Sequence, residues 1–198
     1  MTRVEPSKSS TSTAREENVA IFGGSFNPPH IAHVLAVSVV LCTEAIDRVV
    51  VVPTFQHPFA KSLAPFDDRV RMAELAMGWL PKVEVSRVEE ELGGASRTLR
   101  TLEHFRATNP GWKMRLLMGA DLLVESPKWF GFESIRAIAP PLVLGRVGID
   151  VEGAGAKVLP AISSTDVRAK IKDQSWSELT TIVPREVLTH IRARGLYA

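Results

Sequence analysis

The sequence has few of the features that stabilise secreted proteins or anchor membrane proteins. It contains one cysteine, Cys42, which cannot form an internal disulfide and which its apolar surroundings predict to be a buried thiol. Such a chain suits a reducing cytoplasm. The longest apolar stretch, residues 31–42, includes His33 and Ser38 and is too short to span a bilayer. We therefore expect a cytoplasmic protein without a membrane segment.

The chain also lacks a cluster of charge of either sign. It has 24 Lys and Arg against 22 Asp and Glu, and its basic residues are spread along the sequence, so we expect no nucleic-acid partner. The first 18 residues lack an apolar block and carry Glu5, Glu16 and Glu17, which argues against a secretory signal and against a transit peptide. They predict a disordered tail over 1–18 and a domain over 19–198, long enough at 45% hydrophobic content for one sizeable core.

Apolar runs alternate with helical patterns through this domain, which is typical of a parallel sheet covered on both faces. Two of the runs, residues 49–52 and 116–118, are continuously apolar, as strands buried on both sides are. The pattern predicts a single α/β domain with a Rossmann-like, doubly wound parallel sheet and its ligand crevice at the carboxyl ends of the strands. The expected strands are 19–22, 49–52, 83–85, 114–118, 142–144 and 157–159.

The most informative segment follows the first of these strands and reads G-G-S-F-N-P-P-H-I-A-H, from Gly23 to His33. It joins an apolar strand to an apolar helix through a glycine turn and a proline-stiffened loop. Unpaired backbone N–H groups and the helix dipole make such a place a ready anion site. His30 and His33 are one helical turn apart, so both can face a bound phosphate chain.

Plainer interpretations of this segment remain open. A Gly-Gly-Ser sequence by itself is usually only a turn. The two histidines could instead hold a metal, although the other histidines (His57, His104 and His190) stand at no ligand spacing. A nucleophilic role for Ser25 is disfavoured because no G-x-S-x-G elbow surrounds it.

A second segment, I-S-S-T-D-V-R from Ile162 to Arg168, combines hydroxyl side chains with an arginine at the start of a predicted helix. Taken alone, it indicates a well-capped helix. The same residues can also clamp a phosphate, because they combine neutral donors, the helix dipole and a fixed positive charge.

Together, the two segments resemble the paired signature of the nucleotidyltransferase superfamily of adenylyl- and cytidylyltransferases. Within that superfamily the chain is similar to the bacterial nicotinate-nucleotide adenylyltransferases, over Val19 to Tyr197. The resemblance rests also on ordered blocks at residues 53–61, 96–102, 119–121, 127–135 and 183–197.

The sequence departs from the pattern of that family in three places. Its glycine between the two histidines is Ala32 here, and its usual Ser-Tyr-Thr reads Ser96-Arg97-Thr98, which removes an aromatic ring. The loop over residues 55–61 is a variant of the family's Pro-Pro-His-Lys form. These departures bear on recognition of the pyridine more than on the chemistry.

The resemblance implies adenylyl transfer from ATP to nicotinate mononucleotide, with nicotinate adenine dinucleotide and pyrophosphate as products. The attacking phosphate is already an anion, so the protein has to supply alignment and charge stabilisation instead of a general base. The implied catalytic residues are His30, His33 and Arg168, whose N–H groups can donate to phosphate oxygens. The implied ATP-binding residues are Gly23, Gly24, Ser25, Phe26, Gly119, Asp121, Ile162, Ser163, Ser164 and Thr165. Those implied for the mononucleotide are Asn27, Lys61, Thr98, Trp129 and Phe130.

Several of these residues have an alternative role. Asp121 is assigned to the ATP ribose but could cap the next helix, Lys61 could be an ordinary solvated lysine, and Trp129 could belong to the core. No residues are expected to ligate a metal, because Mg²⁺ would be held mainly by the phosphates of ATP.

Alternative functions are adenylyl transfer to nicotinamide mononucleotide or to phosphopantetheine, and a nucleotide-binding module without turnover. The expected partners are ATP and nicotinate mononucleotide. The sequence leaves the oligomeric state open, a homo-oligomer included.

Overall fold

The computed structural model describes residues 16–57, 62–126, 129–148 and 155–198. Six strands form one sheet in the order β3-β2-β1-β4-β5-β6, and every neighbouring pair is parallel. The strands are β1 (Glu17–Gly24), β2 (Arg48–Pro53), β3 (Val83–Val85), β4 (Trp112–Gly119), β5 (Pro141–Arg146) and β6 (Gly155–Leu159). This order is that of a doubly wound Rossmann sheet, and its topological switch lies between β1 and β4. All six predicted strands are confirmed.

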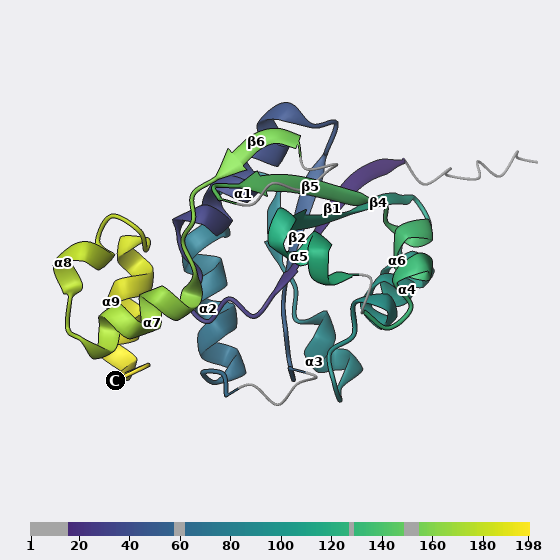
Figure 1. Ribbon diagram of the computed structural model, residues 1–198. Coiled ribbons are helices and arrows are strands. Elements are labelled where there is room, and N and C mark those ends of the chain that lie inside the picture. The colour runs from purple at the N-terminus through teal and green to yellow at the C-terminus, as the bar shows by residue number, and fades with distance from the viewer. Residues whose placement is uncertain (1–15, 58–61, 127–128, 149–154) are drawn as a thin grey trace, which may run out of the picture.

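The helices cover both faces of the sheet (Figure 1). The described helices are α1 (Ile31–Thr43), α2 (Phe66–Met77), α3 (Val88–Leu92), α4 (Thr98–Thr108), α5 (Ala120–Glu125), α6 (Phe132–Ile138), α7 (Ser164–Lys172), α8 (Trp176–Leu179) and α9 (Arg185–Arg194). One core cluster joins the sheet to α1, α2 and α7–α9, and a second joins the opposite face to α3, α4 and α6. Alternate residues of β1 divide between them: Ala20 and Phe22 enter the first cluster, Val19 and Ile21 the second.

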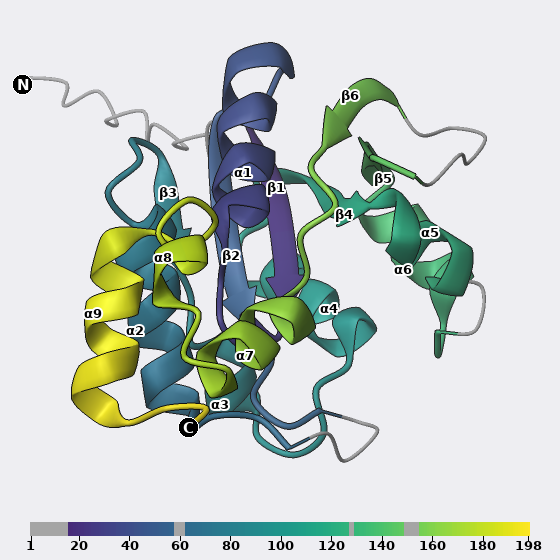
Figure 2. The same cartoon turned by 60° about the vertical axis from the view of Figure 1, so that its left-hand side comes forward.

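The carboxyl ends of β1 and β2 point toward α7, as Figure 2 shows, while α9 lies beside α2 in both ribbon views. The C-terminal helices therefore lie near the edge of the sheet where ligands bind in this class of fold. None of the described helices is long and apolar enough to cross a membrane.

Two details differ from the expectations. Glu17 and Asn18, which were assigned to the tail, are the first residues of β1, where the Asn18 N–H donates to Asp47 Oδ2 at 2.9 Å. Residues 1–15 lie outside the described residues. The prediction that Cys42 is buried is wrong, because the last buried residue of α1 is Val40 and the helix end beyond it leaves the core.

Candidate active site

The glycine turn at the end of β1 leaves open space over one glycine and closes it over the next. A side chain at Gly23 would meet no atom within 4 Å, so a ligand can approach the backbone there. At Gly24 a Cβ would lie 3.1 Å from the ring of Phe26. The Phe26 ring is buried in the first core cluster, with its centroid 5.5 Å from that of Phe22. Phe26 can therefore contact a nucleotide only through its backbone.

The two histidines at the start of α1 lie side by side, with ring centroids 3.9 Å apart. The backbone N–H of His30 donates to His33 Nδ1 at 3.1 Å. Because a backbone N–H only donates, the neutral His33 ring carries its proton on Nε2. No hydrogen bond among the described residues uses that Nε2–H, so it is available to a ligand.

The His30 side chain is 5% exposed, and its Nδ1 is the one buried side-chain nitrogen or oxygen of the described residues without a hydrogen-bond partner. Burial and the positive charge of Arg146 lower the pKa of His30 to about 4, although Asp166 acts in the opposite direction. Burial, His30 and Arg146 likewise hold the pKa of His33 well below its usual value. Both rings are thus neutral donors at neutral pH in the free protein. A bound phosphate would raise their pKa, because negative charge favours the imidazolium.

The segment at the start of α7 lies directly on the loop that precedes the histidines. Ser164 Oγ donates to the Pro28 carbonyl at 2.8 Å, and Arg168 Nη1 donates to the Asn27 carbonyl at 2.8 Å. These bonds join residues more than 130 positions apart. The two phosphate-type motifs of the sequence are therefore brought to one place.

The start of α7 is capped as the sequence predicts. Ser163 Oγ accepts the Asp166 N–H at 3.1 Å, and Arg168 Nη2 donates to Thr165 Oγ1 at 3.2 Å. A helix N-terminus and an arginine thus face the same loop, an arrangement that favours bound anions.

Arg146, at the end of β5, is a site residue that the sequence analysis missed. Its Nη1 donates to Asp121 Oδ2 at 2.6 Å, and its Nη2 donates to the Ile162 carbonyl. It thus connects the turn after β4 with the approach to α7 and adds positive charge beside both histidines. No motif surrounds it, but a charged residue that ends an apolar strand at the carboxyl edge is a signal that could have been used.

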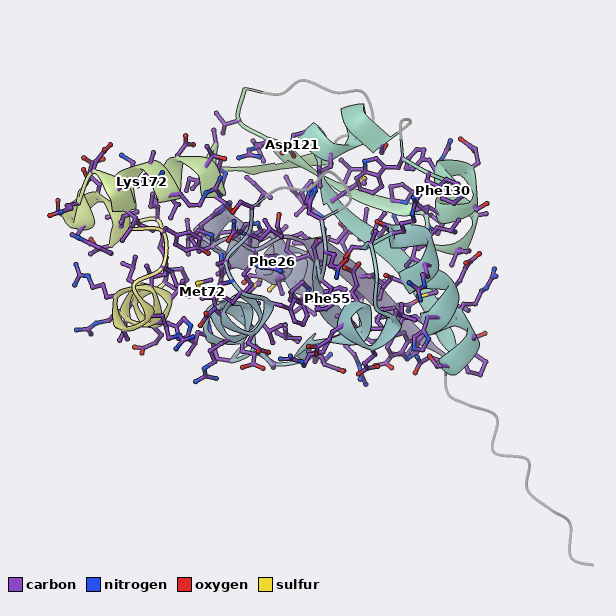
Figure 3. All side chains as sticks on the ribbon, turned by 90° about the horizontal axis from the view of Figure 1, so that it is seen from below. Phe26, Phe55, Met72, Asp121, Phe130 and Lys172 are labelled. Atoms are coloured by element: carbon purple, nitrogen blue, oxygen red, sulfur yellow. The ribbon has the colours of Figure 1, made fainter. Side chains whose placement is uncertain are left out.

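Asp121 lies in the first turn of α5, whose N-cap residue is Gly119. The alternative role as an N-cap is therefore wrong. A Cβ at Gly119 would lie 2.5 Å from Asp121 Oδ1, so glycine leaves the room that this carboxylate occupies. Asp121, labelled in Figure 3, is partly exposed after the carboxyl end of β4. Its carboxylate can therefore also accept a hydrogen bond from a ligand.

Three of the residues expected to bind the mononucleotide, Thr98, Trp129 and Phe130, come from the other face of the sheet. The guanidinium carbon of Arg97 lies 4.8 Å from the centroid of the Phe130 ring, and Gly131 packs against Leu99. The start of α4, with Thr98, therefore lies beside the Phe130 turn, which Figure 3 shows at the α4–α6 side of the molecule. Phe130 is 69% exposed, whereas Trp129 is half-buried against the second core cluster. Lys61 lies outside the described residues.

A buried arginine of α2 joins the loop that follows β1 to the loop that follows β2. Arg69 is 1% exposed and donates to the carbonyls of Ser25, Thr54 and Ala64, at 3.1, 2.6 and 2.9 Å respectively. Sequence reasoning missed Arg69, because an arginine within a helix normally indicates a solvated face. Its role is to satisfy carbonyls of loops that no strand or helix pairs.

No cluster of three or more His, Cys, Asp or Glu side chains suited to a metal ion occurs among the described residues. The donors at the site are instead neutral imidazoles, arginines and helix N–H groups. This set suits phosphate oxygens, and a divalent cation would fit here as a companion of those phosphates.

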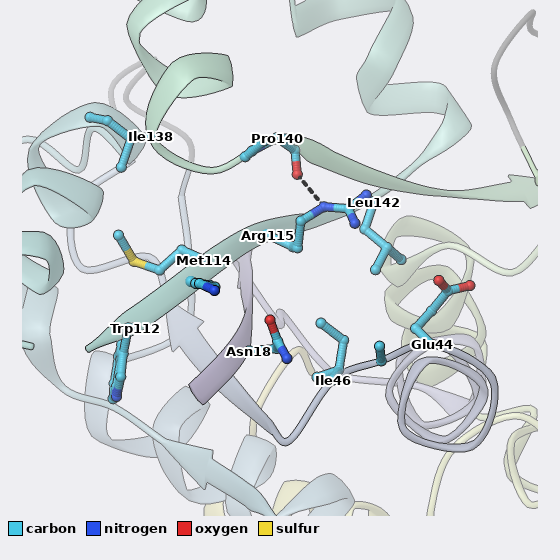
Figure 4. A pocket seen from close by; sticks show the side chains of 11 residues that line it. Asn18, Glu44, Ile46, Trp112, Met114, Arg115, Ile138, Pro140 and Leu142 are labelled. Atoms are coloured by element: carbon cyan, nitrogen blue, oxygen red, sulfur yellow. Dashed lines mark hydrogen bonds between the residues drawn. The ribbon is translucent and has the colours of Figure 1, made fainter. Parts of the chain in front are cut away.

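A pocket of about 480 Å³ lies at the opposite, amino-terminal edge of the sheet (Figure 4). It is lined by the starts of β1, β4 and β5, including Asn18, Met114 and Leu142, and by Arg115, which donates to the Pro140 carbonyl at 3.0 Å. The Arg115 guanidinium is already bound to backbone, and none of the described residues that line this pocket has a buried polar side-chain atom without a hydrogen-bond partner. The candidate active site is therefore the one at the carboxyl edge.

Comparisons with known proteins agree with this geometry. Residues 21–170 match the family described as cytidylyltransferase-like. A protein of Anaeromyxobacter sp. (strain K) named "Probable nicotinate-nucleotide adenylyltransferase" is 42% identical over 90% of this chain and 96% of its own. One of Myxococcus xanthus with the same name is 35% identical over 90% and 94%. The nicotinic acid mononucleotide adenylyltransferase of Plasmodium falciparum complexed with NaAD has a similar fold, with a TM-score of 0.80 at 19% identity over 92% and 98%.

Proposed function

This chain belongs to the cytidylyltransferase-like family and, within it, to the nicotinate-nucleotide adenylyltransferases, and we propose that it transfers the adenylyl group of ATP to nicotinate mononucleotide. A phosphate oxygen of the mononucleotide attacks the α-phosphorus, a new phosphoanhydride forms, and the bond to the β-phosphate oxygen breaks. Nicotinate adenine dinucleotide and pyrophosphate leave, in a step of NAD biosynthesis.

The observation that carries this proposal is the pair of hydrogen bonds that join Asn27 and Pro28 to Arg168 and Ser164. They place a glycine turn, two neutral histidines and a helix N-terminus with its arginine around one space. In that space the leaving pyrophosphate gains charge, and preorganised donors stabilise charge that develops during a reaction.

We assign the roles of individual residues on this basis. His33 Nε2–H, His30 and Arg168 donate to the β- and γ-phosphates. The Gly23 turn, the first backbone N–H groups of α7 and the Thr165 hydroxyl hold the same phosphate chain, while the Ser164 hydroxyl holds the loop at Pro28. Asp121, oriented by Arg146, accepts from the ribose of ATP. Thr98, Trp129 and Phe130 contact the pyridine side of the mononucleotide, and Asn27 and Lys61 its phosphate.

Mg²⁺ accompanies ATP in this proposal. The cation neutralises part of the phosphate charge, and the phosphates are its main ligands because the described residues form no carboxylate cage. We place the reaction in the cytoplasm, where the exposed thiol of Cys42 would stay reduced.

The test is release of pyrophosphate from ATP and Mg²⁺ with one acceptor at a time. Nicotinate mononucleotide should support turnover well above that with nicotinamide mononucleotide or phosphopantetheine. Preference for either of the other two acceptors contradicts the assigned substrate, and release with none of them contradicts the transferase function. Arg168→Lys keeps the charge but loses the planar fork, and should still be clearly impaired.

A further inference from the structure

The side chain of Asn27 is held in one orientation within the active-site loop. It is 4% exposed, and its Oδ1 accepts from the Ala64 N–H at 3.0 Å and from Tyr197 Oη at 2.8 Å. Because a backbone N–H can only donate, the bond from Ala64 identifies the amide oxygen. The amide nitrogen is therefore turned away from Ala64 and Tyr197.

That nitrogen is left for a ligand. No hydrogen bond among the described residues is donated by Asn27 Nδ2, and the atom is not one of their fully buried unpaired atoms. The same residue's carbonyl accepts from Arg168. A donor without a partner among the described residues thus lies in the loop between the glycine turn and His30.

Tyr197 reaches this loop from the last turn of the chain. Helix α9 ends at Arg194 with Gly195 as its C-cap, and the backbone of Tyr197 takes a φ of 67°, a strained value for a residue with a side chain. The helix is anchored to α2, because Asp68 accepts from His190 at 2.9 Å and from Arg194 at 3.0 Å. The end of the chain is thus held against the site.

The Tyr197 hydroxyl remains protonated over the whole pH range in which the enzyme is assayed. Burial raises the pKa of Tyr197, and the nearby charges of Arg168 and Arg69 only partly oppose that effect. Its proton is therefore always available for Asn27 Oδ1.

We propose that Tyr197 is a positioning residue for the transfer reaction. Its hydroxyl and the Ala64 N–H together hold the Asn27 amide so that Nδ2–H₂ faces an oxygen of the bound mononucleotide. This inference rests on the proposed function, which assigns Asn27 to the mononucleotide. It makes the penultimate residue of the chain part of substrate recognition, although Tyr197 does not touch the substrate.

The decisive variant is Tyr197→Phe, which keeps the ring and its packing and removes one hydroxyl. Loss of one hydrogen bond is expected to raise KM for nicotinate mononucleotide about three- to tenfold. The KM for ATP and the melting temperature should remain near wild type. As a matched control, Val187→Ala in the buried face of α9 should lower the melting temperature and leave both KM values unchanged.

A double-mutant cycle separates positioning from general support of the fold. In the Asn27→Ala background, Tyr197→Phe should have no further effect on KM, because its only route to the substrate is gone. Additive effects in the cycle, or wild-type KM values in Tyr197→Phe, overturn the inference. A chain that ends at Leu196 removes the ring together with the hydroxyl and should show a rise in KM for nicotinate mononucleotide at least as large. A wild-type protein that is inactive with every acceptor contradicts the proposed function instead, so the two failures are distinguishable.

Discussion

The phosphate side and the pyridine side of the candidate site are built in different ways. The phosphate side consists of two short segments, Gly23–His33 and Ile162–Arg168, that hydrogen bonds between side chains and backbone carbonyls hold together. The pyridine side consists of exposed or half-buried side chains from the start of α4 and the turn before α6, in contact through Arg97 and Phe130. In the proposed site, anion binding therefore depends on donors that the two segments hold in one arrangement. Pyridine recognition depends on side chains that can be exchanged one at a time.

The electrostatic difference between the sides is equally clear. On the phosphate side, Arg146 adds positive charge beside two neutral histidines, and Arg168 binds the loop that precedes them, so this side is prepared for negative charge. On the pyridine side, Arg97 lies over an aromatic ring. We expect substitutions on the phosphate side to change the rate and those on the pyridine side to change the binding of the mononucleotide.

The largest effect is expected for His33→Ala. In the proposed mechanism the Nε2–H of His33 donates to the leaving phosphates, and loss of one such donor typically costs about 10²–10³ in kcat. The KM for ATP should change much less, because the contact strengthens as charge develops. Steady-state pyrophosphate release measures both constants. An essentially normal kcat removes His33 from the mechanism and with it the distinction between the two sides.

The next effect concerns stability at acid pH, which His30 should limit. Its pKa is about 4 in the folded protein against 6.5 as its ordinary value, so the unfolded chain binds more protons between these two values. The stability that this ring contributes is complete above about pH 6.5 and is lost as the pH falls toward 4. The loss amounts to roughly 3 kcal/mol.

Denaturant unfolding at a series of pH values measures this effect. The matched variant His30→Gln has no titrating ring, so its stability should fall less over the same interval. Equal slopes for the two proteins would show that the low pKa of His30 does not affect folding.

The same contrast explains what could be predicted from the sequence. Continuous apolar runs such as 49–52 mark buried parallel strands, and local motifs such as the one at Ser163 mark helix starts, so the sheet and both phosphate segments were predictable. Arg69 and Tyr197 were not, because each acts on a loop far away in the sequence and no local pattern accompanies it. Cys42 was mispredicted, since an apolar neighbourhood does not show where a helix leaves the core.

On the pyridine side, Trp129→Ala is expected to raise KM for nicotinate mononucleotide about tenfold. An aromatic stack contributes about 0.5–1.5 kcal/mol beyond the area it buries, and the phosphate contacts remain. The KM for ATP should stay near wild type. If both constants are unchanged and the fold is intact, Trp129 belongs to the core beside Phe132, and the exposed Phe130 becomes the better candidate for stacking.

The smallest effect is expected for Arg97, whose guanidinium lies over the ring of Phe130. An exposed cation over an aromatic ring contributes about 0.5–1 kcal/mol, so Arg97→Ala should free Phe130 and raise KM for the mononucleotide about two- to fivefold. Arg97→Tyr should restore most of this loss, because a ring can pack on Phe130 as the guanidinium does. If Arg97 acts through its charge on the anionic mononucleotide instead, tyrosine will not restore binding, and the wild-type KM will rise steeply with ionic strength. A wild-type KM in Arg97→Ala would show that binding of the mononucleotide does not need the contact between Arg97 and Phe130. The pyridine side would then tolerate even the loss of a stacked pair of side chains.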